Sequence, residues 1–114
     1  MASTPLTPIV SAFDLTTAWT VLHTVVSPIN RIGIDAAAFN NYSSSNVQFS
    51  VRIVQNGVAT SLNEFITDKS IRAGGSDLAP AIIGQSVLVG GTIEAKASAN
   101  SSIGVNITAT TFDL

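Results

Sequence analysis

The residues of this chain that could carry catalytic chemistry are one histidine, His23, and seven acidic side chains. A hydrolase triad needs a nucleophile, a base and an orienting acid, but no serine lies in a Gly-x-Ser-x-Gly turn. His23 lies in a stretch with the composition of a strand, which favours a hydrogen-bonded structural histidine over a general base. An enzyme would require Arg31, Asp35 and His23 to meet in a cleft. We therefore predict no catalytic residue and no enzymatic activity.

Cofactor and metal sites need residue spacings that this sequence does not offer. The chain has no cysteine, and its histidine and acids do not follow the spacings of zinc or calcium sites. Its glycines do not form a phosphate-binding loop. Asp35 is expected in the middle of a strand, where a cross-strand ion pair, such as one with Arg52, would fix the register. We expect no cofactor and no metal ion.

Carbohydrate binding uses exposed aromatic side chains as platforms, and the chain has one tryptophan and one tyrosine. Trp19 and Tyr42 fall in different segments of the sequence. Trp19 is expected in the core or under a partner, whereas Tyr42 lies in a predicted loop and could be a contact residue. Binding of a glycan would be favoured if the two rings were exposed together.

The composition limits the partners that the chain can have. Of its 114 residues, 46% are hydrophobic and 11% are charged, against about 25% charged in soluble domains. Serine, threonine and asparagine supply the polarity, so we expect a partner to cover part of this weakly charged surface. With a net charge of −2, nucleic acid is not an expected partner. A membrane is not expected either, because no apolar run approaches the ~20 residues of a span, and the N-terminus lacks a signal-peptide pattern.

Apolar alternation between turn residues predicts an all-β chain. The clearest predicted strands cover residues 31–40, 47–54, 88–97 and 103–112, with further strands within 16–26 and 63–72. Seven to eight short strands of this kind are typical of an antiparallel β-sandwich or jelly roll. We predict a single domain over residues 16–114, preceded by an extended N-terminal arm over residues 1–15.

Local signals make more specific predictions within this framework. Asn56-Gly57 is typical of a type I′ hairpin turn and would pair residues 47–55 with residues 58–62. Residues 78–83 could form a short turn of helix before Gly84. The side chains predicted to share one face of the first clear strand are Ile32, Ile34, Ala36 and Ala38. In the second, a half-buried strand, Val47, Phe49, Val51 and Ile53 form the apolar face, and in the last strand Ile103, Val105, Ile107 and Ala109 are predicted to point inward.

Residues 1–15 contain Pro5 and Pro8, which cannot pair in the middle of a sheet and so predict an extended arm or an edge segment. The apolar residues of this segment have no local pairing partner. We therefore expect them to contact a partner protein, together with the loop tyrosine. The predicted partner-binding residues are Ile9, Val10, Phe13, Leu15 and Tyr42.

Four stretches of the sequence carry a family resemblance. They are Arg31-Ile32-Gly33-Ile34-Asp35-Ala36 with the turn at 40–46 and the strand at 47–54, Ile66-Thr67-Asp68-Lys69-Ser70-Ile71 with Ala73-Gly74-Gly75, Ile83-Gly84-Gln85-Ser86-Val87-Leu88 with Gly90-Gly91, and Ile93-Glu94-Ala95-Lys96-Ala97-Ser98-Ala99. Their order resembles that of small structural proteins of tailed bacteriophages, in particular capsid decoration (cement) proteins with a β-sandwich or jelly-roll fold.

The resemblance implies a non-enzymatic virion protein, made in the host cytoplasm, that binds the outside of the capsid and cements neighbouring major capsid proteins. We expect it to act as a homodimer at the junctions between major capsid proteins, with a trimer as the second choice. Similar small β domains also occur in phage tails and fibres. A tail- or fibre-associated adhesion module that binds a host surface glycan is therefore the alternative function.

Overall fold

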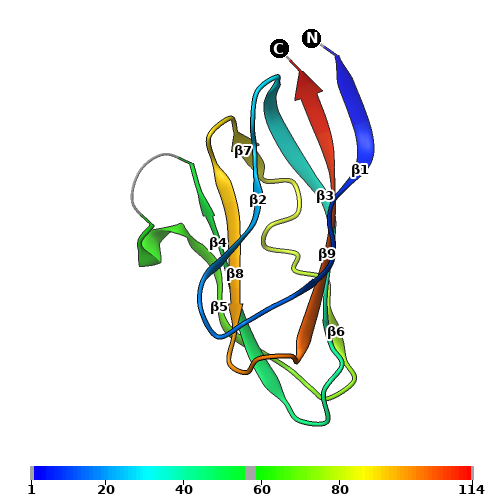
Figure 1. The fold of residues 1–114 in the computed structure, drawn as a ribbon, viewed down its shortest axis with the longest axis vertical. Helices are drawn as coiled ribbons and strands as arrows, with labels where there is room; N and C mark the ends of the chain where they lie inside the picture. Colours follow the sequence, from blue (N-terminus) through cyan, green and yellow to red (C-terminus); the bar gives the residue numbers. More distant parts are fainter. Residues whose placement is uncertain (1, 56–58, 114) are drawn as a thin grey trace.

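The structure, a computed structural model, describes residues 2–55 and 59–113, which form two antiparallel sheets packed face to face (Figure 1). The elements are β1 (Ser3–Asp14), β2 (Thr20–Thr24), β3 (Ile29–Asn41), β4 (Val47–Val54), the 3-10 turn η1 (Ser61–Asn63), β5 (Glu64–Ile71), β6 (Ser76–Asp77), β7 (Ser86–Leu88), β8 (Thr92–Ala97) and β9 (Ile103–Asp113). The predicted all-β sandwich is confirmed. The described residues contain nine strands instead of seven to eight, because two very short strands, β6 and β7, share one edge.

The strand order interleaves early and late parts of the chain. The larger sheet has the order β1-β9-β3, with β6 and β7 both paired to the remaining edge of β3. The smaller sheet has the order β2-β8-β4-β5. If β6 and β7 are taken as one interrupted edge strand, this is the strand order of a jelly roll. Both chain ends lie at the same end of the sandwich (Figure 1), where Asp113 N donates to the Ala2 carbonyl at 2.8 Å.

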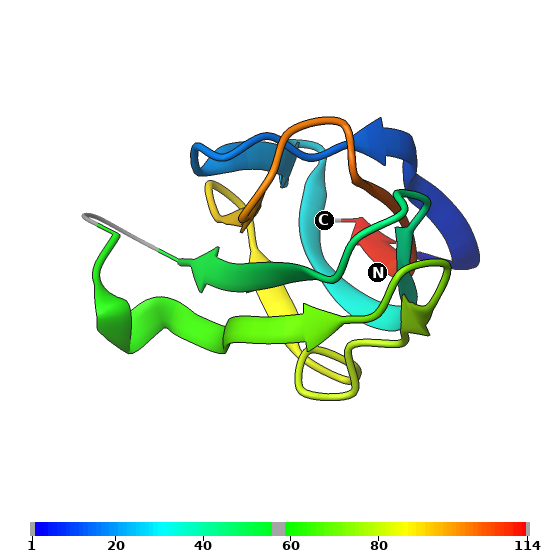
Figure 2. The same cartoon turned by 90° about the horizontal axis from the view of Figure 1, so that it is seen from below.

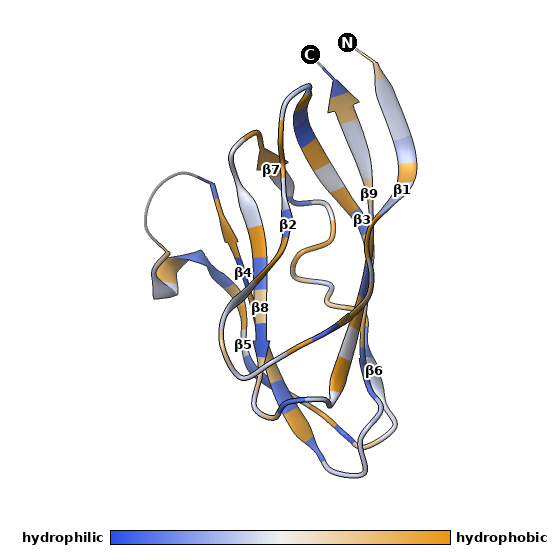
Figure 3. Cartoon of the chain, in the orientation of Figure 1, coloured by the Kyte–Doolittle hydropathy of each residue, from blue (hydrophilic) through white to orange (hydrophobic). Residues whose placement is uncertain are grey.

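The core lies between the two sheets, which Figure 2 shows from one end of the sandwich. The inward residues predicted for two strands are confirmed as buried: Val47, Phe49, Val51 and Ile53 in β4, and Ile103, Val105, Ile107 and Ala109 in β9. Figure 3 shows the resulting alternation of apolar and polar residues along the strands. Phe39 of β3 stacks on Phe49 of β4 with ring centroids 4.6 Å apart, so this aromatic pair joins the two sheets.

β3 departs from the uniform alternation predicted for it. Ile34 is buried as expected, but the next buried residues are Ala37 and Phe39, whereas Ala36 is exposed. The cause is a bulge between Ile34 and Ala36, where the register with β9 shifts. A one-residue slip exchanges the two faces of a strand. The prediction that Ala36 and Ala38 share a face with Ile32 and Ile34 is therefore wrong, and both alanines turn outward.

The predicted pairing of residues 47–55 with residues 58–62 is also wrong. β4 pairs with β5 instead, in a register that places Val47 opposite Ile71. Asn56-Gly57, the basis of the prediction, lies outside the described residues. The chain between the two strands ends in η1, whose first turn is capped by the Thr60 hydroxyl, which accepts a hydrogen bond from Leu62 N at 3.2 Å.

Of the two forms predicted for residues 1–15, an extended arm or an edge segment, the structure shows an edge strand. β1 pairs antiparallel with β9, from Ser3 opposite Phe112 to Asp14 opposite Gly104, with three irregularities in the register. Leu6 and Ala12 have positive φ angles of 52° and 49°. Such interruptions, together with the prolines, hinder the pairing of a further strand along this edge.

Between β6 and β7 the chain makes successive turns, and the short helix predicted for residues 78–83 does not form. Ile82 N donates to the Ala79 carbonyl at 3.1 Å, and Gln85 N donates to the Ile82 carbonyl at 3.2 Å. These turns bury Ile82 in the core and leave Leu78 68% exposed. Leu78 thereby becomes part of an outer surface of the sandwich.

Candidate functional site

Four of the five predicted partner-binding residues lie against the protein's own core. Val10 and Leu15 are buried in it, and Ile9 and Phe13 are partly buried and pack against it. The predicted contact with a partner protein was inferred from their lack of a local pairing partner, but β1 pairs with the distant β9, which places it over the core. Val10 and Leu15 are core residues and cannot form a contact surface in this fold.

Tyr42, the fifth predicted residue, is exposed. Its hydroxyl donates to Asp14 Oδ1 at 2.7 Å. This hydrogen bond is the main reason that the pKa of Tyr42 is raised above its ordinary value, because ionisation would remove the shared proton beside a carboxylate. Trp19 has different contacts, with Arg52 and Lys96 on the smaller sheet. The two aromatic rings thus have separate surroundings.

The three residues that a catalytic cluster would need are engaged separately. The Arg31 guanidinium carbon lies 3.7 Å from the centroid of the Phe112 ring. Asp35 Oδ2 accepts a hydrogen bond from Thr110 Oγ1 at 2.8 Å. His23 belongs to β2 in the other sheet. Arg31, Asp35 and His23 therefore do not form the cleft that the enzyme hypothesis requires.

The outer face of the larger sheet carries small, uncharged side chains at its centre. Ala36 pairs with Thr108 and Ala38 pairs with Asn106 across β3 and β9. Two open depressions, of about 270 and 210 Å³, are both lined by Ala36 and the exposed Leu78. We call the surface formed by Ala36, Ala38, Leu78, Asn106 and Thr108 the alanine face.

The outer face of the smaller sheet is charged. Arg52 of β4 forms an ion pair of 2.6 Å with Glu94 of β8, and both side chains are largely buried, at 17% and 14% exposed. The predicted ion pair of Arg52 with Asp35 is wrong, since the two residues lie in different sheets. The Trp19 ring centroid lies 4.1 Å from the Arg52 guanidinium carbon and 5.0 Å from Lys96 Nζ. The indole therefore extends from the start of β2 across β8 to β4.

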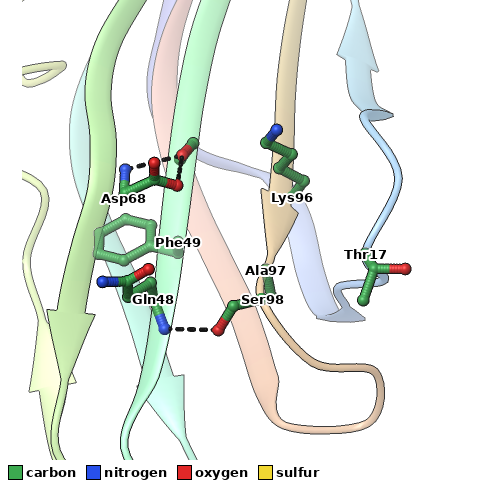
Figure 4. A pocket seen from close by; sticks show the side chains of 8 residues that line it. Thr17, Gln48, Phe49, Asp68, Lys96, Ala97 and Ser98 are labelled. Carbon is green, nitrogen blue, oxygen red and sulfur yellow. Dashed lines mark hydrogen bonds between the residues drawn. The ribbon is translucent and has the colours of Figure 1, made fainter.

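A pocket of about 250 Å³ opens on this charged face (Figure 4). We call it the polar pocket, after the polar residues that line it: Thr17, Gln48, Ser50, Asp68, Lys96 and Ser98. These residues come from β4, β5, the end of β8 with the residue that follows it, and the segment before β2, four stretches that are far apart in the sequence. The site was not predicted, because no local sequence motif contains more than two of its residues.

A second pocket, of about 260 Å³, lies where β1 approaches β2 at one side of the sandwich. Its lining is mostly apolar and contains Pro8, Ile9, Val25, Val26, Ile29 and Ile32 beside Thr7, Thr24, Thr111 and His23. Burial lowers the pKa of His23 below its ordinary value, against the opposing effect of a hydrogen bond with the backbone of Ile9. The imidazole is therefore neutral at pH 7, as expected for a structural histidine.

Comparison with protein-family models finds no matching family, and comparison with curated proteins finds no relative. Within residues 2–55 and 59–113, no group of three or more His, Cys, Asp and Glu side chains is placed to hold a metal ion. None of the helical structure in the described segments has the length and apolarity needed to cross a bilayer. The surface features that remain as candidate binding sites are the alanine face and the polar pocket.

Proposed function

We propose that this protein is a non-enzymatic structural protein of a bacteriophage virion, which binds the outside of the capsid and cements neighbouring major capsid proteins. The observation that carries the proposal is the alanine face, an exposed sheet surface whose central side chains bear no charge. Jelly-roll domains serve as viral capsid and lectin domains, among other roles, so the fold is compatible with the proposal only by analogy. The support for the proposal therefore comes from the surface of the protein.

Docking onto another protein removes water from both surfaces. Charged groups lose several kcal/mol of hydration each when they are buried without a partner, whereas alanine methyl groups and threonine hydroxyls lose little. At the centre of the alanine face, Ala36 and Ala38 offer apolar surface, and Leu78 projects beside them. The two depressions that Leu78 lines can accept side chains of the partner.

A protein that binds the assembled shell more tightly than its free subunits stabilises the shell by mass action. A homodimer at a junction would present two alanine faces and so bridge two major capsid proteins, and a trimer would bridge three. The protein would be made in the host cytoplasm and reside on the exterior of the capsid.

Co-sedimentation with empty capsid shells tests this proposal, using shells of the phage that encodes the chain, assembled without it. Wild-type protein should bind the shells saturably. Ala36→Glu places a charge in the centre of the alanine face and should weaken binding at least tenfold, because the carboxylate would be buried unpaired. The matched control is Ala18→Glu, at an exposed alanine beside Trp19 in the segment before β2, and it should bind like the wild type.

Two results would contradict the proposal. The first is the absence of saturable binding to the shells. The second is equal binding by the wild type and by Ala36→Glu, provided that both are folded by circular dichroism.

A tail- or fibre-associated adhesion module that binds a host surface glycan is the second candidate function. The observation that favours it is the polar pocket, which offers hydrogen-bonding groups of both kinds on an exposed face. The sedimentation experiment separates the two candidates, because such a module would bind glycans without binding capsid shells.

A further inference from the structure

The polar pocket obtains its carboxylate from an irregularity in β5. The pairing of β4 with β5 shifts between Phe49 and Val51, so β5 bulges opposite Ser50. Asp68 lies in this bulge with a φ angle of 46°, a left-handed conformation that aspartate tolerates better than most residues. Bulges redirect side chains, and this one places the Asp68 carboxylate at the pocket.

A buried serine holds this arrangement in place. Asp68 N donates to Ser50 Oγ at 2.9 Å, and the same hydroxyl lies 3.4 Å from Asp68 Oδ1. Ser50 is almost completely buried although it points to the outer side of the sheet. The position of the carboxylate is therefore fixed by the backbone and by a side chain that has no other hydrogen-bonding partner among the described residues.

The remaining polar groups of the pocket are free to bind a ligand. In Figure 4, Asp68 and Gln48 lie on one side of the pocket and Lys96, Ser98 and Thr17 on the other. Ser98 Oγ accepts a hydrogen bond from Gln48 N at 2.9 Å and keeps its own proton to donate. Neither Asp68 nor Lys96 takes part in an ion pair among the residues that the structure describes. The pocket thus presents one carboxylate, one ammonium group, one amide and several hydroxyls.

We propose that the polar pocket binds an uncharged pyranose, either a hexose or an N-acetylhexosamine, at the end of or within a glycan. Each sugar hydroxyl both donates and accepts hydrogen bonds, so one ring can donate to Asp68 and accept from Lys96. An anionic ligand would meet the Asp68 carboxylate, and a cationic ligand would meet the Lys96 ammonium. The volume of about 250 Å³ has room for a single sugar ring.

Trp19 extends the site beyond the pocket. Lys96 both lines the pocket and lies 5.0 Å from the centroid of the Trp19 ring. A sugar that accepts a hydrogen bond from Lys96 would therefore change the surroundings of the indole. A second sugar residue of a longer glycan would contact the indole beside Lys96.

The pocket and the alanine face lie on opposite outer faces of the sandwich. A copy that docked through the alanine face would still present the polar pocket to solvent. The sugar site does not depend on the capsid function, and it can exist whether or not the protein binds a shell.

Titration of the free protein with single sugars tests the proposal directly. The probes are methyl glycosides of glucose, galactose and mannose and of N-acetylglucosamine, with sialic acid as an anionic and glucosamine as a cationic comparison. We expect at least one uncharged glycoside to bind with a Kd on the order of 1 mM, as single sugars of this size allow. Binding would be followed by the fluorescence of Trp19, the one tryptophan of the chain, and by amide chemical shifts of β4, β5 and β8.

Two variants assign the binding to the pocket. Asp68→Asn keeps the tolerated left-handed backbone and removes the charge, and it should weaken binding about tenfold because a charge-assisted hydrogen bond is lost. Gln48→Ala should weaken binding severalfold. The matched control is Asp35→Asn, which removes an exposed carboxylate from the opposite outer face and should leave sugar binding unchanged.

Three outcomes would overturn the proposal. The first is the absence of chemical-shift changes at the pocket with every uncharged glycoside at concentrations up to about 50 mM, well above the expected Kd. The second is binding by sialic acid or glucosamine alone. The third is equal affinity of the wild type and both pocket variants when their spectra show an intact fold.

Discussion

The outer face of the larger sheet and the outer face of the smaller sheet are built from the same alternation, yet they carry opposite kinds of side chain. Ala36, Ala38 and Thr108 occupy the centre of the first face, and Asp35 borders one of its two depressions. On the second face, Arg52 and Lys96 lie among other polar groups that need either a partner or water.

This difference shows how one small sandwich can offer two kinds of surface. A face of small uncharged groups gives little chemistry but can be stripped of water at low cost, which suits a large protein contact. A face with an ion pair and an open polar pocket stays hydrated, and the water in the pocket can be replaced by a polar ligand. The bulge in β3 turns Ala36 and Ala38 outward, and the bulge in β5 brings Asp68 to the polar pocket. The charged residues of β4 and β8 point outward through the regular alternation of those two strands.

The largest expected effect on stability comes from substituting Phe49, which packs on Phe39 and so joins the two sheets in the core. Phe49→Ala should lower the free energy of unfolding by about 3–5 kcal/mol, because it leaves a cavity beside Phe39. Phe65→Ala, at a partly exposed phenylalanine of β5, should cost less than about 1 kcal/mol. Urea unfolding followed by circular dichroism measures both. Similar losses in the two variants would mean that Phe49 does not join the sheets as described.

Removing one partner of each of the two ion pairs among the described residues should have effects of intermediate size on stability, and the two losses should differ. Arg52→Ala removes the partner of the largely buried Glu94 and the contact with Trp19, and should cost about 2 kcal/mol. Lys69 is 48% exposed in its pair with Asp77, so Lys69→Ala should cost about 0.5 kcal/mol or less. Thermal unfolding at low and high salt measures both. If the two variants lost equal stability, the charged face would lack the tight ion pair described above.

The smallest expected effect is the pH dependence of stability that comes from His23, which lines the second pocket between β1 and β2. The pKa of His23 is lowered in the folded protein, mainly by burial, whereas the unfolded chain keeps the ordinary value of 6.5. The unfolded state therefore binds more protons as the pH falls through 6.5, so the free energy of unfolding decreases in that range and is fully retained above it. The His23→Gln variant should lack this decrease in the free energy of unfolding between neutral and acidic pH. Urea unfolding at a series of pH values checks it, and parallel curves for both proteins would show that His23 does not contribute.

Where a strand has a regular register, its buried residues were predictable from the sequence. β4 and β9 follow the period of two, and their inward residues Phe49 and Val105 were identified without the structure. In β3 the period of two does not continue after Ile34, because a bulge is a property of the pairing with β9 and leaves no local signal in the sequence. The partner of a strand was likewise not predictable from the turn signal at residues 56–57, since β4 pairs with a strand farther along the chain.

The candidate site was predictable only in part. From the low charge and small residues we predicted a surface for a partner and placed it on residues 9–15 and Tyr42, but Val10 and Leu15 fill the core instead. The polar pocket depends on the bulge at Asp68 and on the approach of residues distant in sequence. Single-sequence patterns do not contain such long-range contacts.

The central claim, that the alanine face is covered in the virion while the charged face is not, can be tested by cysteine protection. The chain has no cysteine, so Ala36→Cys and Thr17→Cys each introduce a single thiol, one on each outer face. In the free protein, a maleimide should label both variants rapidly, because both residues are exposed. On capsid shells, we predict that labelling of Ala36→Cys slows at least tenfold while Thr17→Cys reacts as before, and the reverse pattern or equal labelling of the two thiols would contradict the account.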